Sequence, residues 1–453
     1  MLNKARNLPR PRLSGPLTAT EASPPPTTSR SVEHFESRVN TGIFQSKGGS
    51  AKIAGLNGRA RWRHYHAPSA RGANPMSIYE QVLTFIHRPE PESFQRLALD
   101  VFRHQFKAVG AYRRYCEGRG VDPDAVRIVD DVPAVSNLAF KYADLAIDGA
   151  ARSAEAAIYL TSGTTQGRER RGRHIVARPE IYRASAIAHL RTMLFPDARR
   201  VAILAMHPTA DATAESSLAA MISWCIEEFG TRTHLAVASR DRIDVEAATG
   251  FLADAEARRE PVCILGTTAA FAALFSELRS SGVKLRLAPG SRMMDTGGAK
   301  GQAVPMQAPE VIGRAGELLA IAPAMVVNEY GMTELCSQLY DATAFNCPGV
   351  SNTQERFKIP PPWLRVTARD PVTLRPMPDG EIGLLTFFDL ANVGSVSAVM
   401  TEDLGWVERG RVRVLGRANG GEARGCALAI GQFSATEAAR RTGVTPERVE
   451  APR

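Results

Sequence analysis

The chain has 453 residues, of which 44% are hydrophobic and 23% charged, so it can bury the core of one large domain with a smaller one, or of two to three domains. Its net charge of +9 comes from residues 1–75, which carry 12 basic and 3 acidic side chains, while the remainder carries 44 of each. A neutral body excludes a nucleic-acid groove built from net charge, so we expect no nucleic-acid partner.

Residues 1–75 are rich in Pro, Ser, Thr, Arg and Gly and show no sustained apolar periodicity. Such a segment cannot bury enough surface to offset its chain entropy. We therefore expect a disordered basic tail or a start codon assigned too early, and a protein that remains active when it begins at Met76. A basic arm for nucleic-acid binding or organelle targeting is the alternative.

The rest of the chain has the pattern of a layered α/β protein. Residues 76–150 show helical spacing of apolar side chains. From residue 156, short apolar runs alternate with helical stretches, which predicts a mostly parallel sheet covered by helices. The predicted strands are 156–160, 201–205, 235–238, 262–265, 292–295 and 325–327, and the predicted helices lie near 216–229, 244–259, 269–281 and 307–321.

After residue 345 the pattern changes to short strands between turns, at 364–367, 381–388, 395–400 and 406–415. This predicts a small, largely antiparallel β subdomain. The expected organisation is a tail at 1–75, an α/β body at 76–345, a β subdomain at 346–430 and a C-terminal tail at 431–453.

The six cysteines are scattered and none forms a Cys-x-x-Cys pair, which favours a reducing cytoplasm over a zinc site or a disulfide-rich domain. The longest apolar runs, such as 318–327, are about half the ~20 residues of a membrane-spanning helix. We therefore expect a cytoplasmic protein without stable membrane insertion.

A loop dense in hydroxyl residues and glycine follows the first predicted strand, at 161–167. Backbone N–H groups and hydroxyls in such a loop can bind phosphate oxygens, although a loop of this composition can also be purely structural. The candidate phosphate-binding residues are Thr161, Ser162, Gly163, Thr164, Thr165 and Gly167. Arginines at 168, 170, 171 and 173 could add bidentate contacts to phosphates, or form a solvated charged run.

A second motif, 328–334, ends a predicted strand and begins a helical pattern. Open α/β sheets bind ligands at the carboxyl ends of their strands. Here Tyr330 could stack on a base, Thr333 could contact a phosphate, and Glu334 could bind Mg²⁺. The alternative is an N-capped helix with an acidic first turn.

A third motif places Asp403 between Glu402 and Leu404, followed by Arg417. The Asp403 carboxylate could accept both hydroxyls of a ribose, with Arg417 beside it. The alternative is an aspartate that caps its own tight turn.

The order of these motifs resembles the adenylate-forming superfamily, and more narrowly the acyl-protein synthetase of the bacterial luminescence fatty-acid reductase, over about 76–430. Asp295 to Gly298 with Lys300 and Gly301, and Ser216 to Leu218, also fit. The resemblance implies an adenylate-forming α/β body with a small antiparallel subdomain and ATP and Mg²⁺ as cofactors. It implies no full C-terminal lid domain, since only 36 residues follow Arg417 and the last lysine is Lys358.

The resemblance also implies roles for single residues. The loop at 161–167 would hold phosphates, although Gln166 stands where the family usually has glycine. Thr333 would contact the α-phosphate, Glu334 the Mg²⁺, and Asp403 the ribose with Arg417 nearby. The adenine slot would be formed by Gly297, Gly298 and Tyr330, and Gly331 and Met332 would also belong to the cofactor-binding residues.

Three further residues are candidates for the chemistry. Lys300 is the nearest lysine by motif, and His207 could touch the substrate carboxylate, although a lone histidine is more often structural. Cys426 would carry the acyl group, because the synthetases that the chain resembles hold it on a cysteine near the C-terminus. The alternative for Cys426 is a small buried apolar side chain.

The predicted function is ATP-dependent activation of a carboxylic acid, of fatty-acid type by the resemblance, as its acyl-AMP. Transfer of the acyl group to a protein thiol follows, with a reductase-like or other acyl-accepting protein as partner. Two alternatives remain at this point: an acyl-CoA ligase of the phenylacetate type, and a nucleotide-binding scaffold without catalysis.

Overall fold

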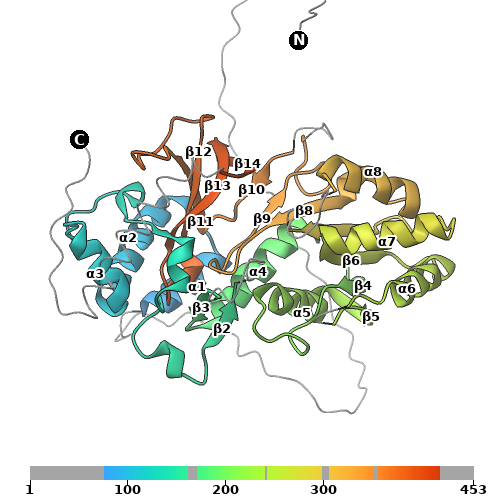
Figure 1. Ribbon diagram of the computed structural model, residues 1–453, viewed down its shortest axis with the longest axis horizontal. Helices are drawn as coiled ribbons and strands as arrows, with labels where there is room; N and C mark the ends of the chain where they lie inside the picture. The colour runs from blue at the N-terminus through green and yellow to red at the C-terminus, as the bar shows by residue number, and fades with distance from the viewer. Residues whose placement is uncertain (1–75, 162–170, 240–241, 298–305, 351–355, 419–453) are drawn as a thin grey trace, which may run out of the picture. The chain divides into compact units, whose positions relative to one another are not determined.

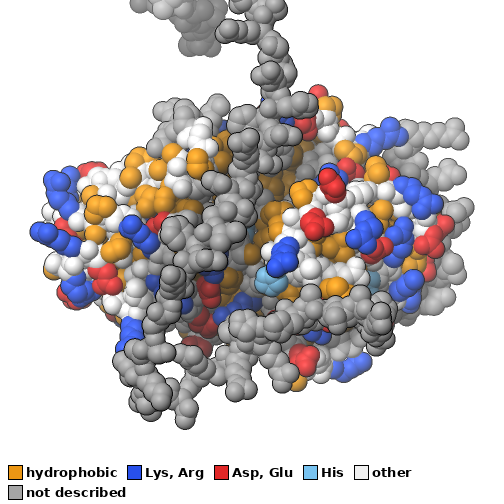
Figure 2. Space-filling model, turned by 180° about the vertical axis from the view of Figure 1, so that it is seen from behind, with side chains coloured by type: hydrophobic (Ala, Val, Ile, Leu, Met, Phe, Trp, Pro, Cys, Tyr) orange, Lys and Arg blue, Asp and Glu red, His pale blue; other side chains and the backbone are white. Residues whose placement is uncertain are grey.

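The computed structural model describes residues 76–161, 171–239, 242–297, 306–350 and 356–418. The chain divides into two units, Met1–Arg71 and Gly72–Arg453, and all described residues belong to the second. The tail predicted at 1–75 therefore lies outside the described residues. On the face seen in Figure 2, basic and acidic side chains are interspersed, as the even charge count of the body predicts.

Three helices open the described part of the chain: α1 (Ile78–His87), α2 (Pro91–Ala108) and α3 (Gly110–Gly118). A capping box between Ser77 and Glu80 starts α1. The helical prediction is wrong beyond Gly118, where the chain forms only short 3-10 turns and β1 (Val135–Ser136) up to residue 152. Pro123 and Pro133 fall in this stretch and prevent a continuous helix.

A twelve-stranded sheet forms the centre of the fold (Figure 1). Its parallel half has the order β5-β4-β6-β7-β8, with β5 at the edge. The strands are β4 (Val201–Met206), β5 (Gly230–Ala236), β6 (Val262–Thr267), β7 (Arg292–Thr296) and β8 (Val326–Tyr330). The helices between and before them are α4 (Pro179–Met193), α5 (Ser217–Phe229), α6 (Val245–Arg258), α7 (Thr268–Ser280) and α8 (Ala308–Leu319).

The parallel strands separate two hydrophobic cores. Along β4, Val201, Ile203 and Ala205 face one core, and the alternate residues face the other. Helices α4 and α5 contribute to the first core, whereas α6, α7 and α8 contribute to the second. Both faces of the inner strands β4 and β6 are therefore covered, and their nearly continuous apolar sequences follow from that burial.

The sheet continues as an antiparallel half with the order β9-β10-β14-β13-β12-β11. The strands are β9 (Leu339–Asp341), β10 (Lys358–Ile359), β11 (Leu364–Arg369), β12 (Ile382–Asp389), β13 (Ala398–Glu408) and β14 (Arg411–Arg417). Because β9 pairs with β8, the antiparallel strands near the C-terminus are hydrogen-bonded into the same sheet as the parallel strands. The layered α/β fold with C-terminal antiparallel strands is confirmed, while the domain boundaries stay a prediction.

Two details of the strand prediction are wrong. One strand, β13, runs through the predicted turn at 401–405, and the turn lies instead at Arg409 and Gly410, which both have positive φ, as in a type I′ hairpin. The first predicted strand, β2 (Ala157–Leu160), pairs with β3 (Arg173–Val176) in a separate hairpin. Within the described ranges, every helix is too short or too polar to cross a bilayer.

Candidate active site

The carboxyl ends of the parallel strands lie along one edge of the sheet. In the strand register Met206 pairs with Gly266, Gly266 with Asp295, and Thr296 with Glu329. His207 and Gly297, which follow β4 and β7, and Tyr330, the last residue of β8, therefore lie at the same edge. This is where open α/β sheets bind their ligands.

The second and third sequence motifs meet at this edge. The Tyr330 hydroxyl donates to the Asp403 carboxylate at 2.7 Å. Asp403 also pairs with Arg417 across β13 and β14, with 3.9 Å between its Oδ1 and the arginine Nε. The Tyr330 ring stacks on Phe387 from β12 at 6.0 Å between centroids. Asp403 lies within a strand, so the alternative of an aspartate capping its own turn is wrong.

The floor of the site contains two buried carboxyls. Thr268 donates to Asp295 at 2.8 Å and to the Gly297 carbonyl at 3.1 Å, while Thr296 donates to Glu329. Burial raises the pKa of Asp295 to about 6 and that of Glu329 to about 7. Gly297 has a positive φ of 85°, which favours glycine and turns the chain away from the strand end.

The segment from Gly331 to Glu334 is an irregular turn, so the helix predicted to begin there is wrong. The chain must reverse between β8 and the antiparallel β9, which leaves no room for a helix. A side chain at Gly331 would place its Cβ 2.5 Å from a Glu329 oxygen, and only glycine avoids that contact. Met332 is half-buried and packs against the core, and Glu334 is buried.

Backbone groups of this turn are bound by distant side chains. The His174 ring binds the Thr333 carbonyl at 2.6 Å, and the Asn392 amide donates to the Glu334 carbonyl at 2.8 Å. Asp389 accepts from the Cys336 N–H at 2.9 Å and from the Ser337 hydroxyl at 2.7 Å. Sequence reasoning missed all three partners, because they lie 52 to 159 residues away in the chain.

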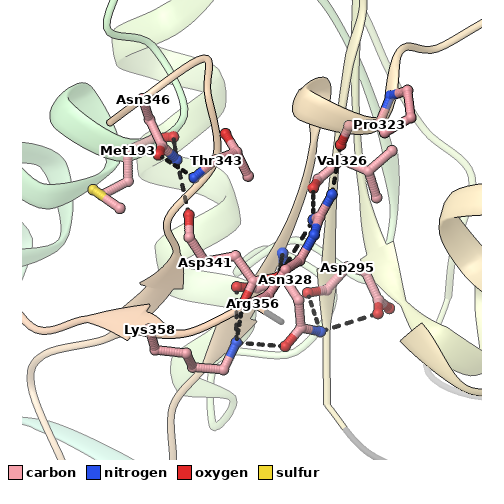
Figure 3. A network of polar contacts seen from close by, with 10 residues as sticks. All are labelled: Met193, Asp295, Pro323, Val326, Asn328, Asp341, Thr343, Asn346, Arg356 and Lys358. Carbon is pink, nitrogen blue, oxygen red and sulfur yellow. Dashed lines mark hydrogen bonds and ion pairs between the residues drawn. The ribbon is translucent and has the colours of Figure 1, made fainter. Parts of the chain in front are cut away.

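A buried ionic network ties the two halves of the sheet together behind the site (Figure 3). Lys358 donates to Asp341 at 3.0 Å and to the Asn328 side chain at 2.7 Å. Asn328 in turn donates to Asp295 at 3.0 Å, and Arg356 approaches Asp341 at 3.5 Å. The network thus joins β10 and β9 to β8 and β7. Its sequence signal is charged residues within otherwise apolar strands.

The remaining predicted residues lie beside the separate β2–β3 pair or outside the described residues. Thr161 follows β2, and its hydroxyl accepts from the Gly172 N–H at 2.8 Å. Arg171 pairs with Glu215 and Arg173 with Asp144, so both arginines bind carboxylates of the chain itself. Ser162, Gly163, Thr164, Thr165, Gly167, Gly298, Lys300 and Cys426 lie outside the described residues, as do Arg168 and Arg170.

His207 lies at the carboxyl end of β4. It is half-buried, its Nδ1 lies 2.9 Å from the carbonyl of its neighbour Pro208, and burial lowers its pKa. A neutral ring at the strand end can still accept a hydrogen bond. Its role toward the substrate carboxylate stays a prediction.

The residues fit a nucleotide with one divalent cation. Asp403 and Tyr330 offer a carboxylate and an aromatic face, and Glu334 offers one carboxylate. Among the described residues no group of three His, Cys, Asp or Glu is placed to bind a metal by itself. Mg²⁺ on a nucleotide needs only one or two protein carboxylates, because phosphates and water fill its other positions.

Curated relatives match a short part of the chain. A long-chain-fatty-acid–luciferin-component ligase of Aliivibrio fischeri is 37% identical over 79 residues, which are 16% of this chain and 21% of that protein. The protein of the same name from Vibrio harveyi is 35% identical over 79 residues, again 21% of its length. The chain thus matches about a fifth of the length of these relatives.

Solved structures match over a much larger share. A 2-hydroxyisobutyryl-CoA ligase in complex with 2-HIB-AMP and CoA superimposes with a TM-score of 0.54 at 16% identity, covering 78% of this chain and 74% of the other. An open conformation of that ligase gives 0.53 at 16% identity, covering 79% and 81%. At such identity the similarity shows the fold alone. The family model for acyl-protein synthetase, LuxE, matches residues 83–434, and the chain belongs to this family.

Proposed function

We propose that the chain uses ATP and Mg²⁺ to activate a carboxylic acid of fatty-acid type as its acyl-AMP, and then passes the acyl group to a protein thiol. The observation that carries the proposal is the contact of Tyr330 with Asp403 at the carboxyl edge of the sheet. An aromatic face and a carboxylate lie together there, and we assign the first to the adenine and the second to the ribose. Membership of the LuxE family supports the same activity.

In the proposed reaction a carboxylate oxygen attacks the α-phosphorus of ATP, and the bond to the bridging oxygen breaks as pyrophosphate leaves. Asp403 accepts the ribose hydroxyls, and the Tyr330 ring and the Gly297 turn bound the adenine. Thr333 donates to the α-phosphate, whose oxygens gain charge as the bond forms. Glu334 would hold the Mg²⁺, which would neutralise phosphate charge.

The acyl carrier must be a thiol that can ionise. Burial raises the pKa of Cys116 and Cys263 to about 12 and also raises those of Cys225 and Cys336, so these four thiols are poor nucleophiles. We propose Cys426 as the carrier, as the family resemblance implies. Cys347, which is half-buried, is the matched control.

ATP–pyrophosphate exchange with a panel of aliphatic and aromatic carboxylic acids tests the activation step. We expect acid-dependent exchange that is strongest for long-chain fatty acids. Exchange with none of the acids by a protein that still binds ATP would support a nucleotide-binding scaffold instead.

Acyl transfer needs its own test. Cys426→Ser should keep exchange but lose hydroxylamine-sensitive labelling from a radioactive acid and ATP, while Cys347→Ser should keep both. Full labelling of Cys426→Ser rules it out as the carrier, and release of product only with CoA would favour the CoA-ligase alternative. The reductase-like acceptor and the cytoplasmic location stay predictions.

A further inference from the structure

Two buried side chains, one on β3 and one in the 3-10 turn after β12, bind the backbone of the Thr333–Glu334 segment. His174 on β3 and Asn392 each have an exposed fraction of 1%. Each binds one carbonyl oxygen of the segment, His174 that of Thr333 and Asn392 that of Glu334. Phe140 meets the His174 ring edge-on at 5.5 Å and restricts its orientation. The two bonds therefore fix the peptide groups that carry the proposed phosphate and Mg²⁺ side chains.

The chemistry of these contacts determines the protonation of the histidine. A carbonyl oxygen can only accept, so the His174 Nδ1 must carry a proton. Burial lowers the pKa of His174 to about 4, so the ring is neutral and its Nε2 is an acceptor. Within the described part of the chain, this Nε2 and the Asn392 Oδ1 are buried atoms without a hydrogen-bond partner.

Both side chains line the same small cavity, of about 10 Å³. That volume holds about one water molecule. A water molecule has two hydrogens, so one molecule can donate to both acceptors, the His174 Nε2 and the Asn392 Oδ1. Exposed Arg178 is also among the lining residues, so water can reach the cavity from solvent.

We propose that His174 and Asn392 are positioning residues of the adenylation site, joined by one water molecule that donates a hydrogen bond to each. The inference rests on the proposed function, which assigns Thr333 and Glu334 to the α-phosphate and Mg²⁺. Loss of either carbonyl contact frees the backbone of Thr333 and Glu334. The Thr333 and Glu334 side chains then leave the geometry that the transition state needs.

The test compares three variants in ATP–pyrophosphate exchange. His174→Phe keeps an aromatic ring, although a larger one, and removes both nitrogens. His174→Asn restores one N–H at the position of Nδ1. The matched control is His189→Phe on α4. His189 is also buried, and burial lowers its pKa to about 4. Its Nε2 lies 3.1 Å from the backbone carbonyl oxygen of Ile359, which is outside the Thr333–Glu334 segment.

We expect His174→Phe to lower kcat at least about tenfold and to raise the half-saturating Mg²⁺ concentration. The Kd for ATP, which depends on Tyr330 and Asp403, should change less than about twofold. His174→Asn should recover most of the lost kcat. His189→Phe should keep the wild-type kcat, even if its melting temperature falls as much as that of His174→Phe.

Unchanged kinetics of His174→Phe, or an equal loss of kcat in His189→Phe, would overturn the positioning role while leaving an active wild type. A wild type without exchange would overturn the proposed function and this role with it. A high-resolution crystal structure tests the water separately: density within hydrogen-bond distance of Nε2 and Oδ1 supports it, and a dry cavity rejects it.

Discussion

The parallel and antiparallel halves of the sheet make different contributions to the site. All six residues of β4 are buried, and the parallel strands end together, so this half supplies a rigid edge from which Gly297 and Tyr330 project. In the antiparallel half, β11 alternates buried and more exposed residues, and β13 brings a single carboxylate, Asp403, to that edge. The candidate site needs residues from both halves, so the first predictions concern the interactions that join the halves.

The largest effect should come from the ionic network between the halves. Lys358→Met leaves Asp341 buried with only the more distant Arg356 as a charged partner, and we expect the free energy of unfolding to fall by about 3 kcal/mol. Urea denaturation measures it. Lys284→Met is the control, because its pair with Glu317 is exposed and should contribute under about 1 kcal/mol. Equal losses in the two variants would show that the network does not join the halves.

Glu334 tests the parallel side of the site. Glu334→Gln removes the negative charge proposed to hold Mg²⁺ while keeping the shape of the side chain. We expect acid-dependent exchange to fall at least about a hundredfold, because charge on the α-phosphate is no longer offset in place. Circular dichroism and thermal melting check that the fold is intact. An exchange rate like that of the wild type at all Mg²⁺ concentrations would remove Glu334 from the metal site.

Glu329, in the parallel half, should make the stability of the protein depend on pH. Its pKa in the folded protein is raised to about 7 from 4.5, chiefly by burial, while Thr296 and Lys358 oppose and Asp295 adds to the shift. Between these values the folded state holds a proton that the unfolded state has lost, so the contribution of Glu329 to stability falls as pH rises from about 4.5 to about 7. Glu329→Gln should match the wild type near pH 4.5 and be more stable by roughly 3 kcal/mol at pH 8. Denaturation at both pH values measures this, and a constant difference would contradict it.

Sequence patterns located β4 and β6 well because burial on both faces gives continuous apolar runs, whereas the edge strand β5 spans 230–236 instead of the predicted 235–238 because it alternates half-buried and exposed residues. The antiparallel half was harder: the alternation in β13 includes Glu402 and Asp403, which read as a turn, although the turn lies at Gly410. Motif order located Tyr330 and Asp403 but could not show that they touch, since 73 residues separate them. The helix expected after Tyr330 is absent because the chain reverses there into β9. The turn is held instead by His174 and Asn392, which bind two of its carbonyls from distant parts of the chain, and no local pattern records such partners.

The contact between Tyr330 and Asp403 is the most direct link between the halves at the site, and its expected effect is the smallest. Tyr330→Phe keeps the ring and its stacking on Phe387 but removes the hydroxyl, which should weaken ATP binding by about 1 kcal/mol. Asp403→Ala also loses the ribose contacts, so it should weaken binding by about 1–3 kcal/mol. Calorimetry of both variants and of the double variant completes a cycle. If the hydroxyl acts by orienting the carboxylate, the double variant should bind ATP no more weakly than Asp403→Ala, because Tyr330 then has no carboxylate to orient. Fully additive losses would mean that the two residues contact ATP independently.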